Sequence, residues 1–267
     1  EDSCDPETEV VCTDVDLELI SAVRRKLNTY KLREDNYKVV DFELECTELE
    51  LNRYIEKFPW IKNESIEEYE ELLLIQALGL KKRMEHTGLK AVVIGLSGGL
   101  DSTLALLVAV KTFELMKLNK NNIYTITMPG FGTTGRTYHN ACKLAKVLGV
   151  SLEEINISAA VRQHFSDIGQ DMTMHDVTYE NAQARERTQI LMDIANMRAA
   201  LVVGTGDLSE LALGWATYNG DHMSMYSVNA SVPKTVMRRM LNALAKGSEN
   251  NELNHILKDV VDTPVSP

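Results

Sequence analysis

The sequence predicts an α/β fold with an open, mostly parallel sheet and helices on both faces. Short runs of β-branched and apolar residues alternate along the chain with longer segments of helical character. Two of these runs end in glycine-rich loops that lead directly into helices, as expected where parallel strands form a ligand-binding edge. With 267 residues and 44% hydrophobic composition, the chain has enough apolar surface for a sizeable core.

The predicted elements follow one another in a regular order. Strands are expected at residues 91–94, 123–128, 152–157 and 200–203, and helices at 15–28, 65–88, 100–116, 137–148, 159–166, 178–197 and from 231 onward. Ser65 and Glu68 form a capping-box pattern at the start of the second helix, and Thr178 is the expected N-cap of a later one. Residues 169–176 show no periodicity and fit either a lid or a disordered segment.

The first glycine-rich loop follows the strand at 91–94 and reads Gly95-Leu96-Ser97-Gly98-Gly99 before a helix that begins near Leu100. Small residues let the backbone approach a ligand, and the first N–H groups of the helix point back into the loop, so an anion is expected there. Ser97 and Ser102 add hydroxyl donors. Asp101 adds a carboxylate, which is consistent with a divalent cation shared with phosphates. The Walker spacing with its lysine does not occur, which disfavours a γ-phosphoryl clamp.

The second glycine-rich loop, 204–210, follows the strand at 200–203 and is expected at the same edge of the sheet. Thr205 can reach a nucleotide, and Glu210, one turn into the next helix, can add a carboxylate to the metal held by Asp101. Lys234 provides a positive charge near a helix N-terminus, which suits phosphate.

Several candidate residues also have purely structural interpretations. Asn181 and Arg185 share one face of a helix, whereas Arg187 points elsewhere. The face shared by Asn181 and Arg185 is alternatively an ordinary solvent-exposed helix face. Glu210 is alternatively a first-turn carboxylate stabilised by the helix dipole, and Trp215 a core residue.

The motif Ser97-Gly98-Gly99-Leu100-Asp101-Ser102 resembles the signature of the PP-loop ATP pyrophosphatases, which cleave ATP between the α and β phosphates. Further motifs at 180–185, 204–210, 214–218 and 232–235 resemble NAD synthetases, in the glutamine-dependent form. The resemblance implies a PP-loop fold, similar to adenine-nucleotide α-hydrolases. It also implies ATP-dependent amidation of nicotinic acid adenine dinucleotide through an acyl-adenylate, with Mg²⁺ and with ammonia supplied by glutamine. Two alternatives stay open: another PP-loop amidotransferase such as GMP synthetase, and a catalytically inactive nucleotide-binding module.

The resemblance also implies roles for individual residues. Asp101 and Glu210 are the implied catalytic and metal-binding residues. The implied ATP-binding residues are Gly95, Leu96, Ser97, Gly98, Gly99, Leu100, Asp101, Ser102, Thr205 and Lys234. The implied substrate-binding residues are Asn181, Arg185, Glu210, Trp215 and Asp221. The chain departs from the family's usual pattern at Gly130 and at Thr133-Thr134, where the family often has serines.

Residues 1–60 resemble the tail of a nitrilase-like glutaminase domain and its linker, which leaves 61–267 as the synthetase domain. The family continues beyond the position of Pro267, so the synthetase domain is expected to be C-terminally incomplete. On this interpretation the glutaminase nucleophile lies upstream, and Cys4 and Cys12 are incidental thiols.

The net charge of −11 is concentrated in the front of the chain. Residues 1–72 hold 21 acidic and 9 basic side chains, a net of −12, whereas the remaining residues hold 18 and 19. The later part therefore has no basic excess for nucleic acid, and no apolar run is long enough to span a membrane. We therefore expect a cytoplasmic protein, which the resemblance further implies to be a homo-oligomer.

Overall fold

The computed structural model describes residues 15–27, 29, 38, 40–43, 65–131 and 135–263. The chain divides into two units, residues 1–55 and 56–267. In the first unit, helix α1 spans Leu17–Lys26, within the predicted range of 15–28. Its N-cap is Asp16, whose carboxylate accepts a hydrogen bond from the Leu19 amide at 2.8 Å.

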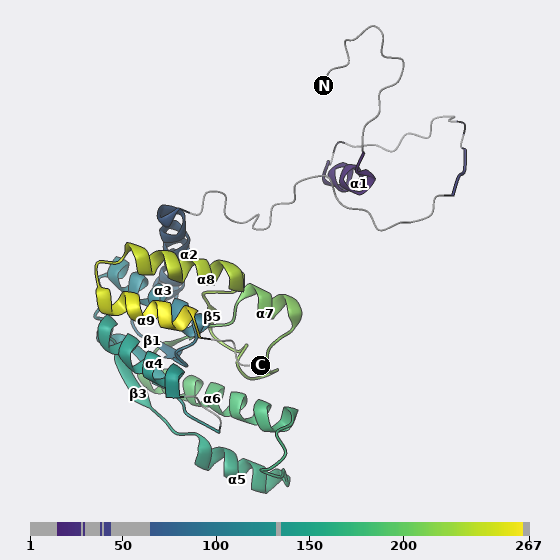
Figure 1. Cartoon of the computed structure of the whole chain (residues 1–267). Helices are drawn as coiled ribbons and strands as arrows, with labels where there is room; N and C mark the ends of the chain where they lie inside the picture. The colour runs from purple at the N-terminus through teal and green to yellow at the C-terminus, as the bar shows by residue number, and fades with distance from the viewer. Residues whose placement is uncertain are drawn as a thin grey trace. The chain divides into compact units, whose positions relative to one another are not determined.

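The second unit is built on a five-stranded parallel sheet with the strand order β3-β2-β1-β4-β5 (Figure 1). The strands are β1 (Val92–Gly95), β2 (Ile123–Thr127), β3 (Ser151–Glu154), β4 (Leu201–Gly204) and β5 (Tyr226–Ser227). Val92 lies opposite Ile123 on one side and Leu201 on the other, so β1 is the central strand. The predicted parallel α/β sheet is confirmed, and the two-residue strand β5 is an addition to it.

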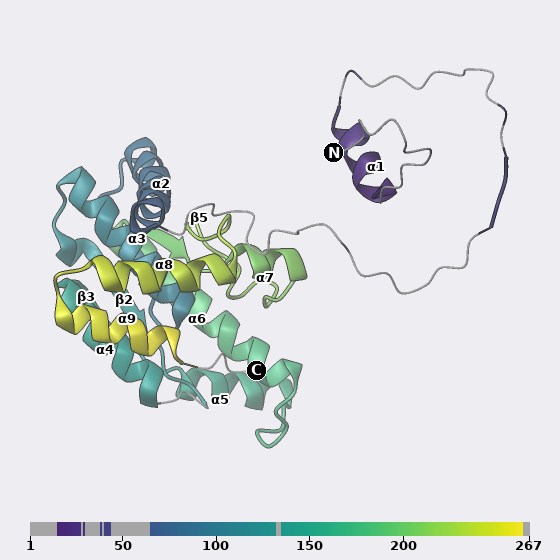
Figure 2. The same ribbon diagram turned by 45° about the horizontal axis from the view of Figure 1, so that its top comes forward.

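Helices cover both faces of this sheet. They are α2 (Ile66–Thr87), α3 (Leu100–Met116), α4 (Gly135–Leu148), α5 (Ser158–Ile168), α6 (Val177–Arg198), α7 (Leu208–Leu213), α8 (Lys234–Gly247) and α9 (Asn251–Val261), with a 3₁₀ turn at Lys120–Asn122. Val92 and Ile94 point into the core formed with α3, whereas Val93 points to the opposite face and packs against α6. Figures 1 and 2 show α6 on the opposite side of the sheet from α3, α8 and α9.

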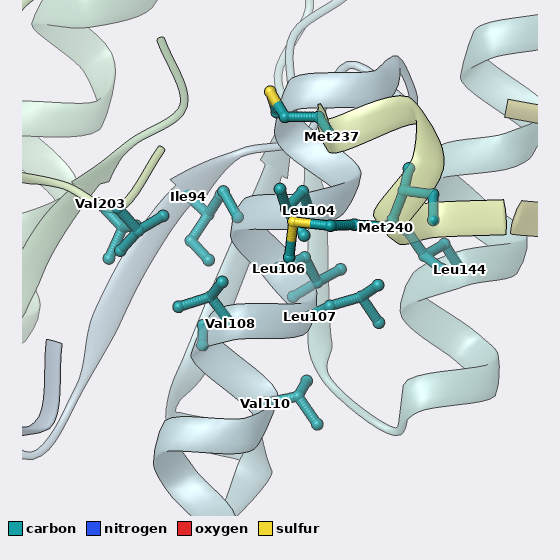
Figure 3. Close-up of a cluster of buried hydrophobic side chains, with 14 of the residues drawn as sticks. Ile94, Leu104, Leu106, Leu107, Val108, Val110, Leu144, Val203, Met237 and Met240 are labelled. Carbon is teal, nitrogen blue, oxygen red and sulfur yellow. The ribbon is translucent and has the colours of Figure 1, made fainter. Parts of the chain in front are cut away.

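The larger core surrounds α3, which is buried on almost all sides. Figure 3 shows Leu104 and Val108 of α3 next to Ile94 of β1, with Met237 and Met240 contributed by α8. A helix that is apolar all round is typical of the interior of an α/β protein. The helix that begins in the first glycine-rich loop is therefore fixed by packing along its length.

Two predicted details of helix boundaries have clear outcomes. Ser65 caps α2 by accepting a hydrogen bond from the Glu68 amide at 3.2 Å, and Gly88 ends this helix with a left-handed φ of 73°. The N-cap predicted for α6 was wrong, because Asp176 caps that helix by accepting from the Tyr179 amide at 3.0 Å, and Thr178 lies inside it.

The connection predicted to be a lid or disordered is a compact turn between α5 and α6. Gly169 ends α5 with a left-handed φ of 72°. Asp171 accepts hydrogen bonds from the backbone amide and the hydroxyl of Thr173, and Gln170 donates to the Met174 carbonyl. Thr133 and Thr134 lie outside the described residues. None of the helices in the described ranges is long and apolar enough to cross a membrane.

Candidate functional site

The two glycine-rich loops leave neighbouring strands of the sheet. The loop 95–99 follows β1 and leads into α3, and the loop 204–207 follows β4 and leads into α7. Strands β1 and β4 are hydrogen-bonded neighbours, and the strand order reverses between them because the chain runs from β1 toward β2 and β3 before it returns to β4. A reversal of this kind opens a crevice at the carboxyl ends of the strands, which is where open α/β sheets bind ligands.

The first loop is held in a conformation that requires glycine. Gly98 has a φ of 80°, and a Cβ atom at this position would lie 2.0 Å from the Thr137 carbonyl oxygen of α4. The Ser97 hydroxyl accepts a hydrogen bond from the Gly99 amide at 3.2 Å and lies 3.1 Å from the Ser102 hydroxyl. Gly99 is the N-cap of α3 and has no side chain to cap the first N–H groups, which suits binding of an anion.

The second loop carries a reciprocal capping box. The Asp207 carboxylate accepts from the Glu210 amide at 2.8 Å, and the Glu210 carboxylate accepts from the Asp207 amide at 3.2 Å. Each carboxylate uses one oxygen for this exchange. Glu210 is thus a first-turn carboxylate of α7 that takes part in the helix cap, and its other oxygen is directed to a different partner.

That partner is Lys234, the first residue of α8. Its Nζ atom lies 2.8 Å from Asp101 Oδ1, 2.8 Å from Asp207 Oδ2 and 2.8 Å from Glu210 Oε1. We call these four residues the carboxylate–lysine cluster. Asp101 and Glu210 come from the first turns of α3 and α7, which follow different loops, and lie close enough together to share a ligand. The structure brings Lys234 and Asp207 to the same place.

The cluster contains three carboxylates and one ammonium group: Asp207 is buried, and the other three side chains are half-buried. Burial opposes the charged form of Lys234, but hydrogen bonds to the three carboxylates outweigh it and raise the pKa of the lysine above its ordinary value. Burial is also the main cause of a raised pKa at Asp101, with Glu210 and Asp207 adding to it and Lys234 opposing it. With all groups ionised, the cluster carries a net charge of −2 and still attracts cations.

The donor set fits a magnesium ion. One carboxylate oxygen from each of Asp101, Asp207 and Glu210 can be chosen so that all three lie within 4.8 Å of one another. Mg²⁺ prefers hard oxygen ligands and usually combines one or two carboxylates with phosphate oxygens and water. The anion-binding start of α3 lies in the same helix turn as Asp101, so phosphates bound there would complete such a site.

A second group of candidate residues joins α6 to the loop 214–223. Asn181 accepts a hydrogen bond from the Thr217 hydroxyl at 2.8 Å, and Arg185 donates to the Tyr218 carbonyl at 3.2 Å. Asp221 accepts from the Thr217 amide at 2.6 Å. Asn181 and Arg185 thus share a face that contacts this loop and is not simply solvated. Arg187 points elsewhere, to the Met128 carbonyl.

This second group is far more exposed than the carboxylate–lysine cluster. Trp215 is 74% exposed, so its interpretation as a core residue was wrong. A cavity of about 450 Å³ is lined by residues of α5, α6 and this loop, among them His164, Arg185 and Asn219.

A family model described as NAD synthase matches residues 74–253, which include both loops and the whole cluster. The chain belongs to the NAD synthase family. It is 38% identical over 272 residues to the glutamine-dependent NAD(+) synthetase of Mycobacterium tuberculosis, with 95% of this chain and 40% of the relative covered. It is 31% identical over 245 residues to the Thermotoga maritima enzyme of the same name, covering 88% and 40%. The chain therefore spans about two fifths of the length of these relatives.

Solved structures of the NAD synthase family agree with this fold. The glutamine-dependent NAD+ synthetase of Acinetobacter baumannii in complex with ADP has a TM-score of 0.65 and 26% identity, covering 76% of this chain and 37% of that one. The NH3-dependent NAD synthetase of Campylobacter jejuni has a TM-score of 0.59 and 23% identity, covering 69% and 76%, which supports the fold alone.

Two buried residues of this NAD synthase domain were not predicted from the sequence. Asp207 is fully buried and completes the group of three carboxylates. Its spacing from Glu210 is a readable capping-box signal, although that signal indicates a helix start and not a ligand. Asn229 is also fully buried, and its side chain donates hydrogen bonds to the carbonyl oxygens of Asp101 and Thr205. No local pattern identifies it.

Proposed function

We propose that the protein catalyses the ATP-dependent amidation of nicotinic acid adenine dinucleotide to NAD, through an acyl-adenylate, with release of AMP and pyrophosphate. The main support is the meeting of two carboxylate-bearing loops at the crevice of the sheet, with Asp101 and Glu210 each 2.8 Å from Lys234 and beside a glycine loop suited to phosphate. Membership of the NAD synthase family supports the same activity.

The nucleotide side of the proposal uses the glycine loop and the cluster. The loop 95–99 and the first turn of α3 would hold the phosphates of ATP through backbone N–H groups and the hydroxyls of Ser97 and Ser102. Thr205 would contact the nucleotide, and Lys234 would exchange carboxylate partners for phosphate oxygens. Asp101, Asp207 and Glu210 would hold Mg²⁺, which when bound would offset negative charge on the phosphates.

The acceptor side uses α6 and the loop 214–223. Asn181, Arg185, Glu210, Trp215 and Asp221 would bind the dinucleotide so that its nicotinate carboxylate faces the α-phosphorus of ATP. The carboxylate oxygen attacks phosphorus and pyrophosphate leaves. Ammonia then attacks the acyl carbon, loses a proton, and displaces AMP. The protein supplies orientation and charge stabilisation in both steps and no covalent nucleophile.

The proposal extends to the longer protein that the relatives suggest. Residues 1–60 would be the end of a nitrilase-like glutaminase domain and its linker, and 61–267 the synthetase domain. Ammonia released from glutamine would then supply the second step. We further propose that the protein forms a homo-oligomer and acts in the cytoplasm, where ATP is available. Neither a nucleic acid nor a membrane is proposed as a partner.

The test is a product assay with the full chain, ATP, Mg²⁺, ammonium and nicotinic acid adenine dinucleotide. We expect AMP, pyrophosphate and NAD in equal amounts, each dependent on both ammonium and the dinucleotide. Amidation of xanthosine monophosphate or nicotinic acid mononucleotide in place of the dinucleotide would assign another substrate. ATP binding without any turnover would favour an inactive nucleotide-binding module, and formation of ADP would exclude the adenylation chemistry.

A further inference from the structure

Asn229 connects the two carboxylate-bearing loops without contributing a carboxylate itself. It lies between β5 and α8 and is fully buried. Its Nδ2 atom donates to the Asp101 carbonyl oxygen at 3.0 Å and to the Thr205 carbonyl oxygen at 2.9 Å. One amide group therefore bridges the first turn of α3 and the loop after β4.

The orientation of this amide follows from its partners. The carbonyl oxygens of Asp101 and Thr205 can only accept, so the NH2 group of Asn229 must face them. Its Oδ1 atom then faces Gln76 of α2, whose Nε2 atom donates to it at 3.0 Å and to the Val228 carbonyl at 2.9 Å. Gln76 is itself only 8% exposed. The two amides thus tie both loops to the long helix α2.

These two amides fix the distance between the chain segments that carry Asp101 and Glu210. This distance is important because the proposed metal site needs carboxylate oxygens from both segments. Asp101 follows the glycine loop and Glu210 follows Thr205, yet carboxylate oxygens of the two residues lie within 4.8 Å of one another. Mg²⁺ requires nearly ideal octahedral geometry at about 2.0–2.1 Å, so a small relative shift of the two loops lowers its affinity. Bonds made outside the metal ligands commonly control affinity in this way.

We propose that Asn229, held in place by Gln76, is a positioning residue that sets the distance between the two carboxylate-bearing loops for binding of Mg²⁺ with ATP. The inference rests on the nucleotide side of the proposed function alone, because it assumes that this crevice binds ATP with Mg²⁺. A merely structural role would lower the free energy of unfolding without a specific effect on the metal, and this difference makes the two roles separable.

The decisive variant is Asn229→Asp, which keeps the size of the side chain but turns a carboxylate oxygen toward two carbonyl oxygens. We expect ATP affinity in the presence of Mg²⁺, measured by calorimetry on the full chain without the dinucleotide, to fall about tenfold or more. Affinity for ATP in EDTA should change far less. The matched control is Thr112→Val, which removes a buried hydrogen bond from α3 to the Ala77 carbonyl of α2 at 3.2 Å, away from the crevice.

A second variant, Gln76→Met, tests the same inference if Asn229→Asp does not fold. It removes the donor to Asn229 Oδ1 and should lower Mg²⁺-dependent affinity in the same direction. The inference is overturned if the folded variants bind ATP with Mg²⁺ as tightly as the wild type, or if affinity falls equally with and without the metal. It is also overturned if the wild type shows no Mg²⁺-dependent binding. Wild-type binding without formation of NAD would remove the proposed function and leave this inference standing.

Discussion

The two groups of site residues differ sharply in how they are held. The carboxylate–lysine cluster is partly buried, and its members are fixed by a capping box, three contacts to Lys234 and the packed helix α3. The loop 214–223 holds Trp215 and Tyr218 at 74% and 82% exposed, fixed mainly by hydrogen bonds to and within its backbone. The proposed nucleotide side is thus organised in the protein alone, whereas the proposed acceptor side leaves large aromatic surface uncovered.

The difference suggests a division of tasks between the two regions. Charge stabilisation acts best when its dipoles and charges are fixed before the reaction, because no reorganisation is then needed. An acceptor surface gains from exposed aromatic side chains, which bury area on binding and lose few rotamers. Changes in the cluster should therefore alter chemistry and stability together, and changes in the loop should alter acceptor binding alone.

The largest expected effect is that of Asp101→Asn. It removes a proposed metal ligand, and we expect a loss of turnover of about a thousandfold, corresponding to roughly 4 kcal/mol. The free energy of unfolding, in contrast, should stay the same or rise. Burial raises the pKa of Asp101, so the folded chain binds its proton more tightly than the unfolded chain, and the free energy of unfolding falls as the pH rises from 3.8 through the raised pKa.

Asparagine removes this pH-dependent loss of stability, so thermal denaturation at neutral pH should show a variant at least as stable as the wild type. Asp167→Asn, on the exposed surface of α5, is the control and should change neither quantity. An inactive variant that also unfolds more easily would mean that the carboxylate supports the fold, contrary to the expectation from its raised pKa.

Gly98→Ala should have the next largest effect. The added Cβ meets the Thr137 carbonyl oxygen at 2.0 Å in a left-handed conformation, so the loop or α4 must move, at a cost of about 3 kcal/mol. ATP affinity and the free energy of unfolding should both fall. Gly149→Ala is matched in conformation, with a φ of 69°, but nothing lies within 4 Å of its Cβ, and it should cost only about 1 kcal/mol. Equal losses from both variants would show that backbone strain alone is responsible.

Lys234→Met leaves three carboxylates without their cation. We expect a loss of about 2 kcal/mol, below the value for fully buried pairs because 30% of the lysine side chain is exposed. Lys120→Met, which breaks an exposed pair with Glu114, should cost under about 1 kcal/mol. Addition of Mg²⁺ or a lower pH should restore part of the lost stability, because either one neutralises the carboxylates. A loss that neither restores would mean that Lys234 acts through packing of its stem.

Local signals were sufficient to predict the central strand, the glycine loop and the helix that follows it. The observed bounds of β1, α2 and α3 lie within a residue or so of those predicted, because capping residues and apolar periodicity act over a few positions. Strand β5 escaped prediction because it has two residues and exists only through pairing with β4.

The side-chain contacts at the site that were not predicted share a different cause. Asn229 bonds to residues 128 and 24 positions away, and Lys234 finds its carboxylates 133 and 24 positions away. A buried asparagine in a turn has no local pattern that distinguishes it from an exposed one. The lysine was expected near phosphate because it begins a helix, but its present carboxylate partners depend on the sheet topology.

The smallest expected effect belongs to the exposed loop. Trp215→Ala should raise KM for the dinucleotide about fivefold, as expected for loss of one aromatic contact, and leave the free energy of unfolding within about 0.5 kcal/mol of the wild type. Met197→Ala is the control, since this residue is 85% exposed at the other end of α6. Turnover at saturating dinucleotide and ATP affinity should be unchanged in both variants. A fall in turnover for Trp215→Ala would mean that the loop orients the reacting carboxylate. The proposed division of tasks between a fixed chemical region and an adaptable binding region would then be wrong.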